Sequence, residues 1–231
     1  MDERHRQELE QVAARYARRA NTDRYSLLRP DVWQLVQERQ RWICRGLAAR
    51  GWQPADLRLV EVGCGGGGNL LEWLRLGVPA AKITGAELLP ERLAAARAVL
   101  PVGVRLVAGD AAVLDIAPGS QDLVMQSTVF SSILDDAVQQ RLADAMWQWL
   151  RPGGAVLWYD FAVDNPANRD VRGVPLSRVR QLFPQGHLQA RRVTLAPPIA
   201  RRVCALHPSL YTAFNAVPWL RSHRLAWITK A

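Results

Sequence analysis

The 231-residue chain has few cysteines, and the three that it has are widely separated, at positions 44, 64 and 204. An odd number of distant cysteines suggests neither a disulfide framework nor a zinc site. The sequence also lacks the charged-then-apolar pattern of a signal peptide and an apolar run long enough to span a membrane. We therefore expect a soluble, cytoplasmic protein without a bound metal ion.

Acidic side chains are scarce in the last third of the chain. Residues 161–231 carry 11 basic and only 2 acidic side chains, whereas residues 58–160 carry 8 basic and 11 acidic ones. The net charge of +9 is thus a property of the last third. Such a segment could attract an acidic substrate, nucleic acid or an anionic membrane. It could equally be a set of arginines on solvated faces, because charge balance alone identifies no partner.

Strand and helix signals alternate from residue 57 onward, after two helical segments of which the second covers about residues 31–50. The alternation predicts an α/β fold with a doubly wound, mostly parallel sheet and helices on both faces. After residue 160 the rhythm breaks, and residues 196–223 are predicted to form a helical cap inserted between two final strands. The predicted strands cover residues 57–62, 82–87, 104–108, 123–127, 155–160, 187–195 and 225–229.

A glycine-rich loop follows the first predicted strand, in VEVGCGGGGNLLEWL. Gly63, Gly65 and Gly68 fit the dinucleotide fingerprint G-x-G-x-x-G. Glu61, together with glycines 63, 65 and 67, fits the pattern E-x-G-x-G-x-G of enzymes that use S-adenosylmethionine (SAM). Both patterns place backbone amides against a ligand at a helix N-terminus, so the glycines alone leave the cofactor open.

Two acidic residues separate the templates. Glu61 stands where a dinucleotide site has an apolar strand residue, and a carboxylate there suits the ammonium group of SAM but would repel a pyrophosphate. A second carboxylate, Asp110, follows the third predicted strand, where it can accept a hydrogen bond from an adenine amino group. Glu87 ends the second strand and can bind ribose hydroxyls in either template. The sequence therefore favours SAM over a nicotinamide cofactor.

At this point the chain resembles the class I SAM-dependent methyltransferases. Five segments carry the resemblance, in the family's order: LVEVGCGGGGNLLEWL, ITGAELLPERLAAAR, VRLVAGDAAVLD, DLVMQSTVFSSILDD and LRPGGAVLWYDF. The resemblance implies a seven-stranded Rossmann-like sheet whose last strand is antiparallel, with SAM lying across the strand ends and S-adenosylhomocysteine as product. Residues 1–56 would form an N-terminal helical segment over the cofactor site, and residues 57–231 the SAM-binding domain.

The resemblance also implies which residues hold the cofactor. The methionine part would lie against the glycine loop and its acid, the ribose against the end of the second strand, and the adenine against the turn after the third. The expected cofactor-side residues are Glu61, Gly63, Cys64, Gly65, Gly67, Glu87, Leu88, Asp110, Ala111 and Gln126. Cys64 is expected as a small filler, and Gln126 near the sulfonium. Tyr25 would close the methionine end, unless it only packs at a helix junction.

The acceptor side is less defined. Asp160, at the end of the fifth strand, and His207, in the cap, are the candidate general bases; a histidine in such a place is also compatible with a structural role. Arg29, Thr128, Asn165 and Arg172 are candidate substrate-binding residues. The sequence lacks the Asn/Asp-Pro-Pro-aromatic signature of enzymes that methylate base amines and the proline-cysteine pair of cytosine C5 enzymes.

Three segments of the last third are DNPANRDVRGVPLSRVRQLFP, VTLAPPIARRV and PWLRSHRLAWI. With them the chain resembles bacterial methyltransferases associated with glycan and surface-polysaccharide assembly. This favours O- or N-methylation of a small molecule or glycan in biosynthesis, with an acidic or phosphorylated acceptor matching the arginines. A nucleic acid partner is not expected, because no RNA-binding module is visible. Peripheral membrane contact by the cap and a homodimer stay open, as do two alternatives: an NAD-dependent oxidoreductase and a non-catalytic SAM-binding module.

Overall fold

The structure, a computed structural model, describes residues 3–18, 26–164, 168 and 170–231. Seven strands form one sheet in the order β3-β2-β1-β4-β5-β7-β6. The strands are β1 (Leu59–Val62), β2 (Ile83–Glu87), β3 (Arg105–Ala108), β4 (Gln121–Ser127), β5 (Leu150–Phe161), β6 (His187–Leu195) and β7 (Arg221–Thr229). Strands β1 to β5 are parallel to one another, and β7 runs antiparallel to both β5 and β6. The predicted seven-stranded, mostly parallel sheet with an antiparallel last strand is confirmed.

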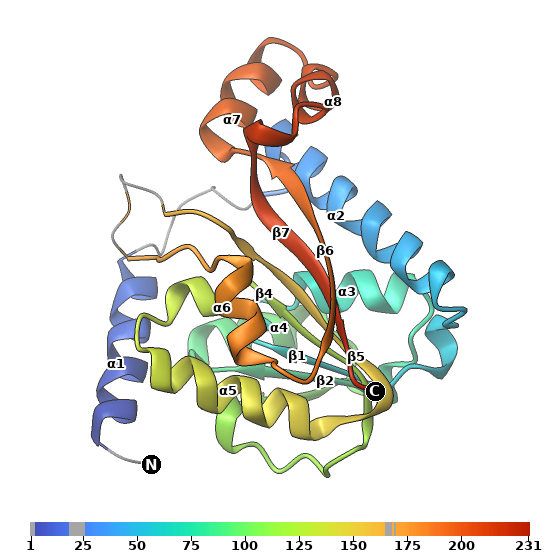
Figure 1. The fold of residues 1–231 in the computed structure, drawn as a ribbon, viewed down its shortest axis with the longest axis vertical. Coiled ribbons are helices and arrows are strands. Elements are labelled where there is room, and N and C mark those ends of the chain that lie inside the picture. Colours follow the sequence, from blue (N-terminus) through green and yellow to red (C-terminus); the bar gives the residue numbers. More distant parts are fainter. Residues whose placement is uncertain (1–2, 19–25, 165–167, 169) are drawn as a thin grey trace.

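Helices cover both faces of the sheet (Figure 1). The helices are α1 (Glu3–Ala17), α2 (Pro30–Ala49), α3 (Gly68–Arg75), α4 (Pro90–Val99), α5 (Asp136–Trp149), α6 (Leu176–Leu182), α7 (Pro197–Leu206) and α8 (Leu210–Asn215), with short 3-10 turns η2 (Pro54–Asp56), η3 (Ala80–Lys82), η4 (Ala111–Val113), η5 (Phe130–Ser132) and η6 (Pro218–Leu220). Side chains of α1, α5 and α6 share one apolar cluster with the sheet, and side chains of α2, α3 and α4 share the other. The cavity described below lies on the α1 and α5 side.

The central strands form because their residues suit burial on both faces. All four residues of β1, the sequence LVEV, are buried, as expected for a central parallel strand between two helical layers. Helix α5 begins where the carboxylate of Asp135 accepts hydrogen bonds from the backbone N–H groups of Ala137 and Val138. The only polar side chain inside β1 is Glu61, and it is the residue that a purely structural strand would not need.

The helical insertion near the C-terminus consists of α7 and α8, between β6 and β7 (top of Figure 1). Its expected end at residue 223 is three residues too late, because β7 already begins at Arg221. Strand β5 likewise begins earlier than expected. Leu150 already pairs with Gln121 of β4, and regular pairing resumes at Ala155 after a register shift; Gly153, between the two, takes a positive φ of 76°. These differences arise because strand pairing continues past the hydrophobic runs that identify the strands.

Candidate active site

A cavity lies at the carboxyl ends of β1, β2 and β3, with about 670 Å³ of empty space out to the solvent. The ends of these strands provide one wall, through residues 62–63, 86–88 and 109–112. Helix α1 provides the facing wall with Leu9, Val12 and Tyr16, and α5 adds Val138 and Leu142. The cavity therefore combines backbone-rich strand ends with apolar side walls.

The glycine loop adopts a backbone that only some of its glycines require. Gly63, Gly65 and Gly67 have positive φ angles of 66°, 57° and 84°. Side chains at these three positions would also meet Val129, Arg92 and Leu100, within 3 Å of an added Cβ. In contrast, Gly68 lies outside the left-handed region, and an added Cβ would meet nothing within 4 Å. The required glycines are thus those of E-x-G-x-G-x-G, and the last glycine of the dinucleotide fingerprint is not required.

Glu61 is fully buried directly below this loop. Its Oε1 atom accepts a hydrogen bond from the Asn69 side-chain amide at 2.5 Å, whereas Oε2 has no partner among the described residues. Burial raises the pKa of Glu61 to about 7, although the Asn69 hydrogen bond and the charge of Arg39 act in the opposite direction. A buried acceptor without a donor is costly, and the ammonium group of a bound SAM is a donor of the required charge. The residues present therefore fit this cofactor.

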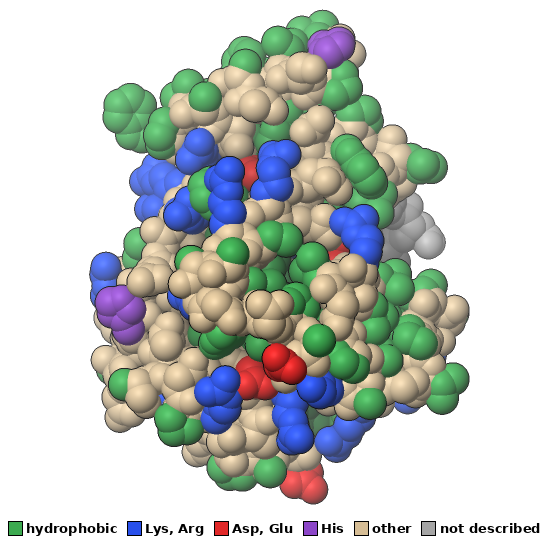
Figure 2. Space-filling view, turned by 90° about the vertical axis from the view of Figure 1, so that its right-hand side faces the viewer, with side chains coloured by type: hydrophobic (Ala, Val, Ile, Leu, Met, Phe, Trp, Pro, Cys, Tyr) green, Lys and Arg blue, Asp and Glu red, His purple; other side chains and the backbone are tan. Residues whose placement is uncertain are grey.

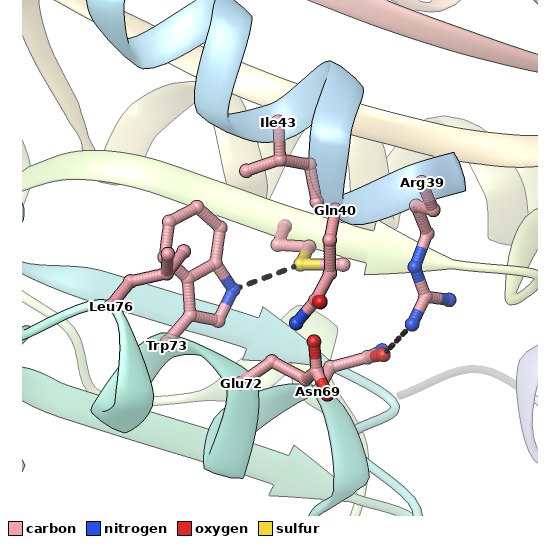
Figure 3. A pocket seen from close by; sticks show the side chains of 8 residues that line it. Arg39, Gln40, Ile43, Asn69, Glu72, Trp73 and Leu76 are labelled. Atoms are coloured by element: carbon pink, nitrogen blue, oxygen red, sulfur yellow. Dashed lines mark hydrogen bonds between the residues drawn. The ribbon is translucent and has the colours of Figure 1, made fainter. Parts of the chain in front are cut away.

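Arg39 of α2 connects to the same loop (Figure 3). Its guanidinium group donates to the Asn69 side-chain oxygen at 2.5 Å and to the Ser127 hydroxyl at 3.3 Å, and it lies 5.2 Å from the centre of the Tyr159 ring. Arg39 is 9% exposed. Nothing in the glycine motif indicates this residue, which lies 22 positions before Glu61 in a helix without a recognisable motif. The small pocket beside it, between α2 and α3, is lined in part by Trp73, whose indole N–H donates to the Met125 sulfur.

Glu87 and Asp110 lie where the sequence predicts them, at the ends of β2 and β3. The two oxygens of Glu87 accept backbone hydrogen bonds from Gly65 at 2.7 Å and Leu89 at 2.9 Å. Each carboxylate oxygen has a second lone pair, so both remain able to accept ribose hydroxyls. Asp110 accepts from the Ala112 N–H at 2.9 Å. The side chains of Leu88 and Ala111 line the cavity between them.

Helix α1 is fastened over this cavity by polar contacts that the sequence did not reveal. His5 Nε2 lies 2.6 Å from Asp110 Oδ2, and His5 is 1% exposed. Arg15 donates to Glu8 at 3.0 Å and to the Ser132 carbonyl at 2.8 Å. The Arg92 guanidinium of α4 lies 4.9 Å from the centre of the Tyr16 ring and thus bridges the glycine loop and α1. The amphipathic pattern of α1 predicts that one face of the helix is buried, but it does not predict which part of the chain that face contacts.

A family model described as a methyltransferase domain matches residues 59–154, from β1 to the start of β5. The chain therefore contains a class I SAM-dependent methyltransferase domain. The matched segment contains the glycine loop, Glu61, Glu87 and Asp110, so the cofactor is S-adenosylmethionine and the product is S-adenosylhomocysteine. In the described residues of the methyltransferase, no group of three or more His, Cys, Asp or Glu side chains could hold a metal ion.

Solved structures share the fold of the methyltransferase. A putative sarcosine dimethylglycine methyltransferase from Galdieria sulphuraria has 14% sequence identity and a TM-score of 0.62, over 86% of this chain and 88% of that one. A geranyl diphosphate C-methyltransferase from Streptomyces coelicolor A3(2) has 14% identity and a TM-score of 0.60, over 82% and 75%. A SAM-dependent methyltransferase from Mesorhizobium loti has 19% identity and a TM-score of 0.58, over 82% and 97%. No protein with a curated description matches the methyltransferase in sequence.

Of the other cofactor-side candidates, Gln126 and Cys64 make only local contacts among the described residues. The Gln126 side chain is buried; it accepts from the Val129 N–H at 3.1 Å and donates to the Tyr159 carbonyl at 3.4 Å. It therefore holds the turn after β4. Burial, and then the charges of Glu61 and Glu87, raise the pKa of the Cys64 thiol, which fits the expected role of a small filler. Tyr25 lies outside the described residues.

The acceptor-side candidates are dispersed. Asp160 is fully buried at the end of β5, where its two oxygens accept from the N–H groups of Ser131 at 3.1 Å and Phe161 at 2.9 Å. Thr128, at the end of β4, has a positive φ of 58°, which is rare for a β-branched residue and typical of functional sites. His207 is exposed at the end of α7, outside the cavity lining, and accepts from the Ser209 N–H.

The two predicted substrate-binding arginines face carboxylates. Arg172 forms an ion pair with Asp136, and Arg29 lies 3.4 Å from Asp31. Their charges are thus already paired in the structure, which makes them less suited to an anionic ligand than the sequence suggested. Asn165, the remaining candidate, lies outside the described residues.

Proposed function

We propose that the methyltransferase methylates an oxygen or nitrogen of a small molecule or glycan that carries an acidic or phosphate group. The observation that carries this proposal is the charge of the chain around the acceptor side. No Asp or Glu follows Asp170 in the sequence, whereas ten Arg and Lys residues do. The cap and the strands β6 and β7 belong to this segment, so every charged side chain that they themselves offer an acceptor is basic.

Neighbours of the same fold accept such molecules. By their descriptions, one neighbour binds geranyl diphosphate, and a Haemonchus contortus methyltransferase binds phosphomonomethylethanolamine. At identities of 14% and 15%, only the fold is shown to be shared with this chain. The two neighbours therefore support a class of acceptor and no particular molecule. A glycan acceptor in bacterial biosynthesis is supported only by the resemblance of the last third of the chain.

The test is product identification. The purified methyltransferase is incubated with isotopically labelled SAM and a metabolite extract of the source cell, and labelled products are identified by mass spectrometry. We expect a labelled product that carries an acidic or phosphate group, with the label on O or N. A labelled product without any anionic group would contradict the proposal. Tight binding of S-adenosylhomocysteine with no labelled product at all would favour a non-catalytic SAM-binding module.

Asp160 is the proposed general base. Burial raises the pKa of Asp160 to about 6, while its hydrogen bonds to Ser131 and Phe161 act in the opposite direction. A carboxylate with such a pKa is a stronger base than an exposed one, which suits deprotonation of a hydroxyl or ammonium acceptor. The Asp160→Asn variant separates this role from a structural one. We expect kcat to fall by about a hundredfold or more with little change in S-adenosylhomocysteine affinity. A loss of thermal stability with unchanged kcat would instead assign Asp160 to holding η5.

His207 is a second candidate base, because the cap would lie over a bound acceptor. The His207→Ala variant should reduce kcat without changing stability, because His207 is exposed. An unchanged kcat would assign His207 a structural role only, at the end of α7, where its ring accepts a hydrogen bond from the Ser209 N–H. Thr128 and Asn165 remain proposed acceptor contacts.

We further propose a cytoplasmic location, with residues 1–56 serving as a cover and residues 57–231 as the SAM-binding domain. None of the described helices has both the length and the apolar composition needed to cross a bilayer. The cap nevertheless exposes Leu206, Phe214 and Trp219, which are 80%, 41% and 85% exposed, beside arginines 201 and 202. Such a surface supports peripheral contact with an anionic membrane or a homodimer. Vesicle sedimentation and light scattering of the Trp219→Ser variant distinguish the two.

A further inference from the structure

Two arginines face each other across β6 and β7. Arg192 and Arg224 are directly paired residues of the antiparallel ladder, so their side chains leave the same face of the sheet. Like charges in directly opposite positions destabilise a sheet. Consistent with this, burial and then the charge of Arg192 lower the pKa of Arg224. The pair is therefore a local cost to the fold unless something compensates it.

No compensating group is present in the part of the chain that the structure describes. Neither guanidinium has a carboxylate within ion-pair distance there, unlike Arg172 and Arg29. The Nε atom of Arg224 is buried and has no hydrogen-bond acceptor among the described residues. A buried N–H donor without an acceptor destabilises the fold, and a charged donor does so more strongly than a neutral one.

Protection of the sheet edge explains the presence of Arg192 but not that of Arg224. Strand β6 is the edge strand, and a charged residue such as Arg192 is a common means of blocking edge-to-edge association. Arg224 lies on β7, which is paired on both sides, so edge protection does not explain it. The neighbouring Arg191 points to the opposite face and lies 3.6 Å from the centre of the Trp42 ring, so it has its own partner.

The pair lies at the end of the sheet where the cavity opens. On its other side Arg224 pairs with Asp160 of β5, and the carboxylate of Asp160 accepts from Ser131, next to the cavity residue Ser132. The same sheet face carries Ala226 and Ile228, which share an apolar cluster with the cavity residues Val12 and Leu142. Arg192, Arg224 and Asp160 thus form a cross-strand row from the sheet edge toward the cofactor cavity. A different group of Lys and Arg side chains gathers on the upper half of the face that carries α2 (Figure 2), and α2 packs on the other side of the sheet from this row.

We propose that Arg192 and Arg224 bind a phosphate or diphosphate group of the methyl acceptor. Two adjacent guanidinium groups supply parallel N–H donors in the planar arrangement that matches phosphate oxygens. An anion between them would accept the unpaired Arg224 Nε–H and remove the repulsion across the ladder. The inference rests on the proposed function only in taking this anion to be part of the acceptor.

The test is calorimetric titration of the full chain with inorganic pyrophosphate at low ionic strength, where screening is weak. We expect binding that Arg224→Gln and Arg192→Gln each weaken by about tenfold. Arg224→Lys keeps the charge but loses the paired donors, so it should show an intermediate loss. Arg202→Gln, at an exposed position of α7, removes the same charge elsewhere and should change affinity by less than about twofold. Equal losses in all of these variants, or no binding by the wild type, would overturn the proposal.

Two further measurements assign the anion. The side-chain Nε–H signal of Arg224 in a nitrogen–proton NMR spectrum, identified by its absence in Arg224→Gln, should shift when pyrophosphate is added. An unmoved signal would count against the site. Binding only to vesicles with an anionic phospholipid, with none to free pyrophosphate, would assign the pair to a lipid headgroup and overturn the acceptor assignment. Titration with S-adenosylhomocysteine keeps the questions apart, since a failure of cofactor binding alone would refute the proposed function and not the anion site.

Discussion

The imidazole of His5 lies 2.6 Å from the carboxylate of Asp110, and 105 residues separate the two in the sequence. Asp110 is the residue predicted to accept the adenine amino group, and His5 belongs to the first turns of α1. The contact therefore joins the wall of the cavity that α1 forms to a residue on the opposite wall. The predicted adenine contact and the docking of α1 consequently involve one and the same side chain.

Replacement of His5 should weaken cofactor binding without any change to the cofactor loop. In His5→Ala, α1 loses a buried contact, so we expect S-adenosylhomocysteine affinity to fall by about five- to tenfold, which corresponds to about 1 kcal/mol. Calorimetry measures the affinity, and hydrogen exchange should show faster exchange of the α1 amides. Gln7→Ala, an exposed neighbour on the same helix, is the matched control. Faster exchange in α1 with unchanged affinity would show that α1 does not contribute to the cofactor site.

Two alanine substitutions in the glycine loop should differ in their effects on stability and on S-adenosylhomocysteine binding. Gly65→Ala places a Cβ at a φ of 57°, against Arg92, so we expect a loss of about 1 to 2 kcal/mol in stability and no measurable S-adenosylhomocysteine binding. Gly68→Ala, at the first position of α3, meets open space and should leave binding unchanged and stability equal or slightly higher. Denaturation curves and calorimetry measure both. A Gly68→Ala variant that loses its ligand would instead favour the dinucleotide type of loop.

The stability of the ligand-free methyltransferase should depend on pH through Glu61. Its pKa is raised from 4.5 to about 7, so the folded chain holds a proton that the unfolded chain loses between these values. The cost of burying the charge therefore grows as pH rises from 4.5 to about 7 and is then constant, reaching about 3 kcal/mol. Glu61→Gln should remove this cost, so we expect it to be more stable than the wild type at about pH 8 but not at about pH 4.

The same variant should bind the cofactor less well, because it has lost the carboxylate that we expect to face the ammonium group. Thermal denaturation with and without S-adenosylhomocysteine at both pH values measures the two effects together. Asn69→Ala serves as a control, since it removes the hydrogen bond to Glu61 but not the charge. If Glu61→Gln were equally destabilised at both pH values, the burial of a charged group at this position would be refuted.

The cap should be anchored by one buried carboxylate. Glu38 Oε2 of α2 accepts from the Tyr211 hydroxyl at 2.8 Å and from the Thr194 N–H at 3.1 Å. A double-mutant cycle with Glu38→Gln and Tyr211→Phe should give a coupling of about 1 to 3 kcal/mol in chemical denaturation. Tyr16→Phe, on α1, is the control partner for Glu38→Gln, and its effect should be additive. A coupling near zero for Glu38 and Tyr211 would mean that apolar packing alone holds the cap.

The sheet could be predicted from the sequence because its signals are local. Apolar runs, glycine turns and carboxylates at strand ends lie within a few residues of one another, and the prediction that Glu61, Glu87 and Asp110 lie in or at the ends of strands rests on them. Those signals do not mark where pairing stops, so the starts of β5 and β7 were predicted too late. Whether a strand continues depends on a neighbour that can be far away in sequence.

The contacts around the cavity could not be predicted, because each joins residues that no motif relates. Nothing in the sequence distinguishes Arg39 from the other arginines of α2. Only the structure does so, because it places Arg39 beside Asn69. The choice of Arg29 and Arg172 as ligands failed to account for their neighbouring carboxylates. Arg224 was not chosen because its lack of an acceptor is a property of three strands together. Charged residues can be counted in a sequence, but only the structure shows which of them form ion pairs.

Glu38 and Arg39 are consecutive residues of α2 that serve different parts of the methyltransferase. Glu38 holds the cap through Tyr211, and Arg39 holds the glycine loop through Asn69. The cap therefore cannot be exchanged as an independent module to alter acceptor choice. A chimera that takes α7 and α8 from another protein must also supply a hydroxyl at position 211, or replace Glu38, without shifting the turn of helix that carries Arg39.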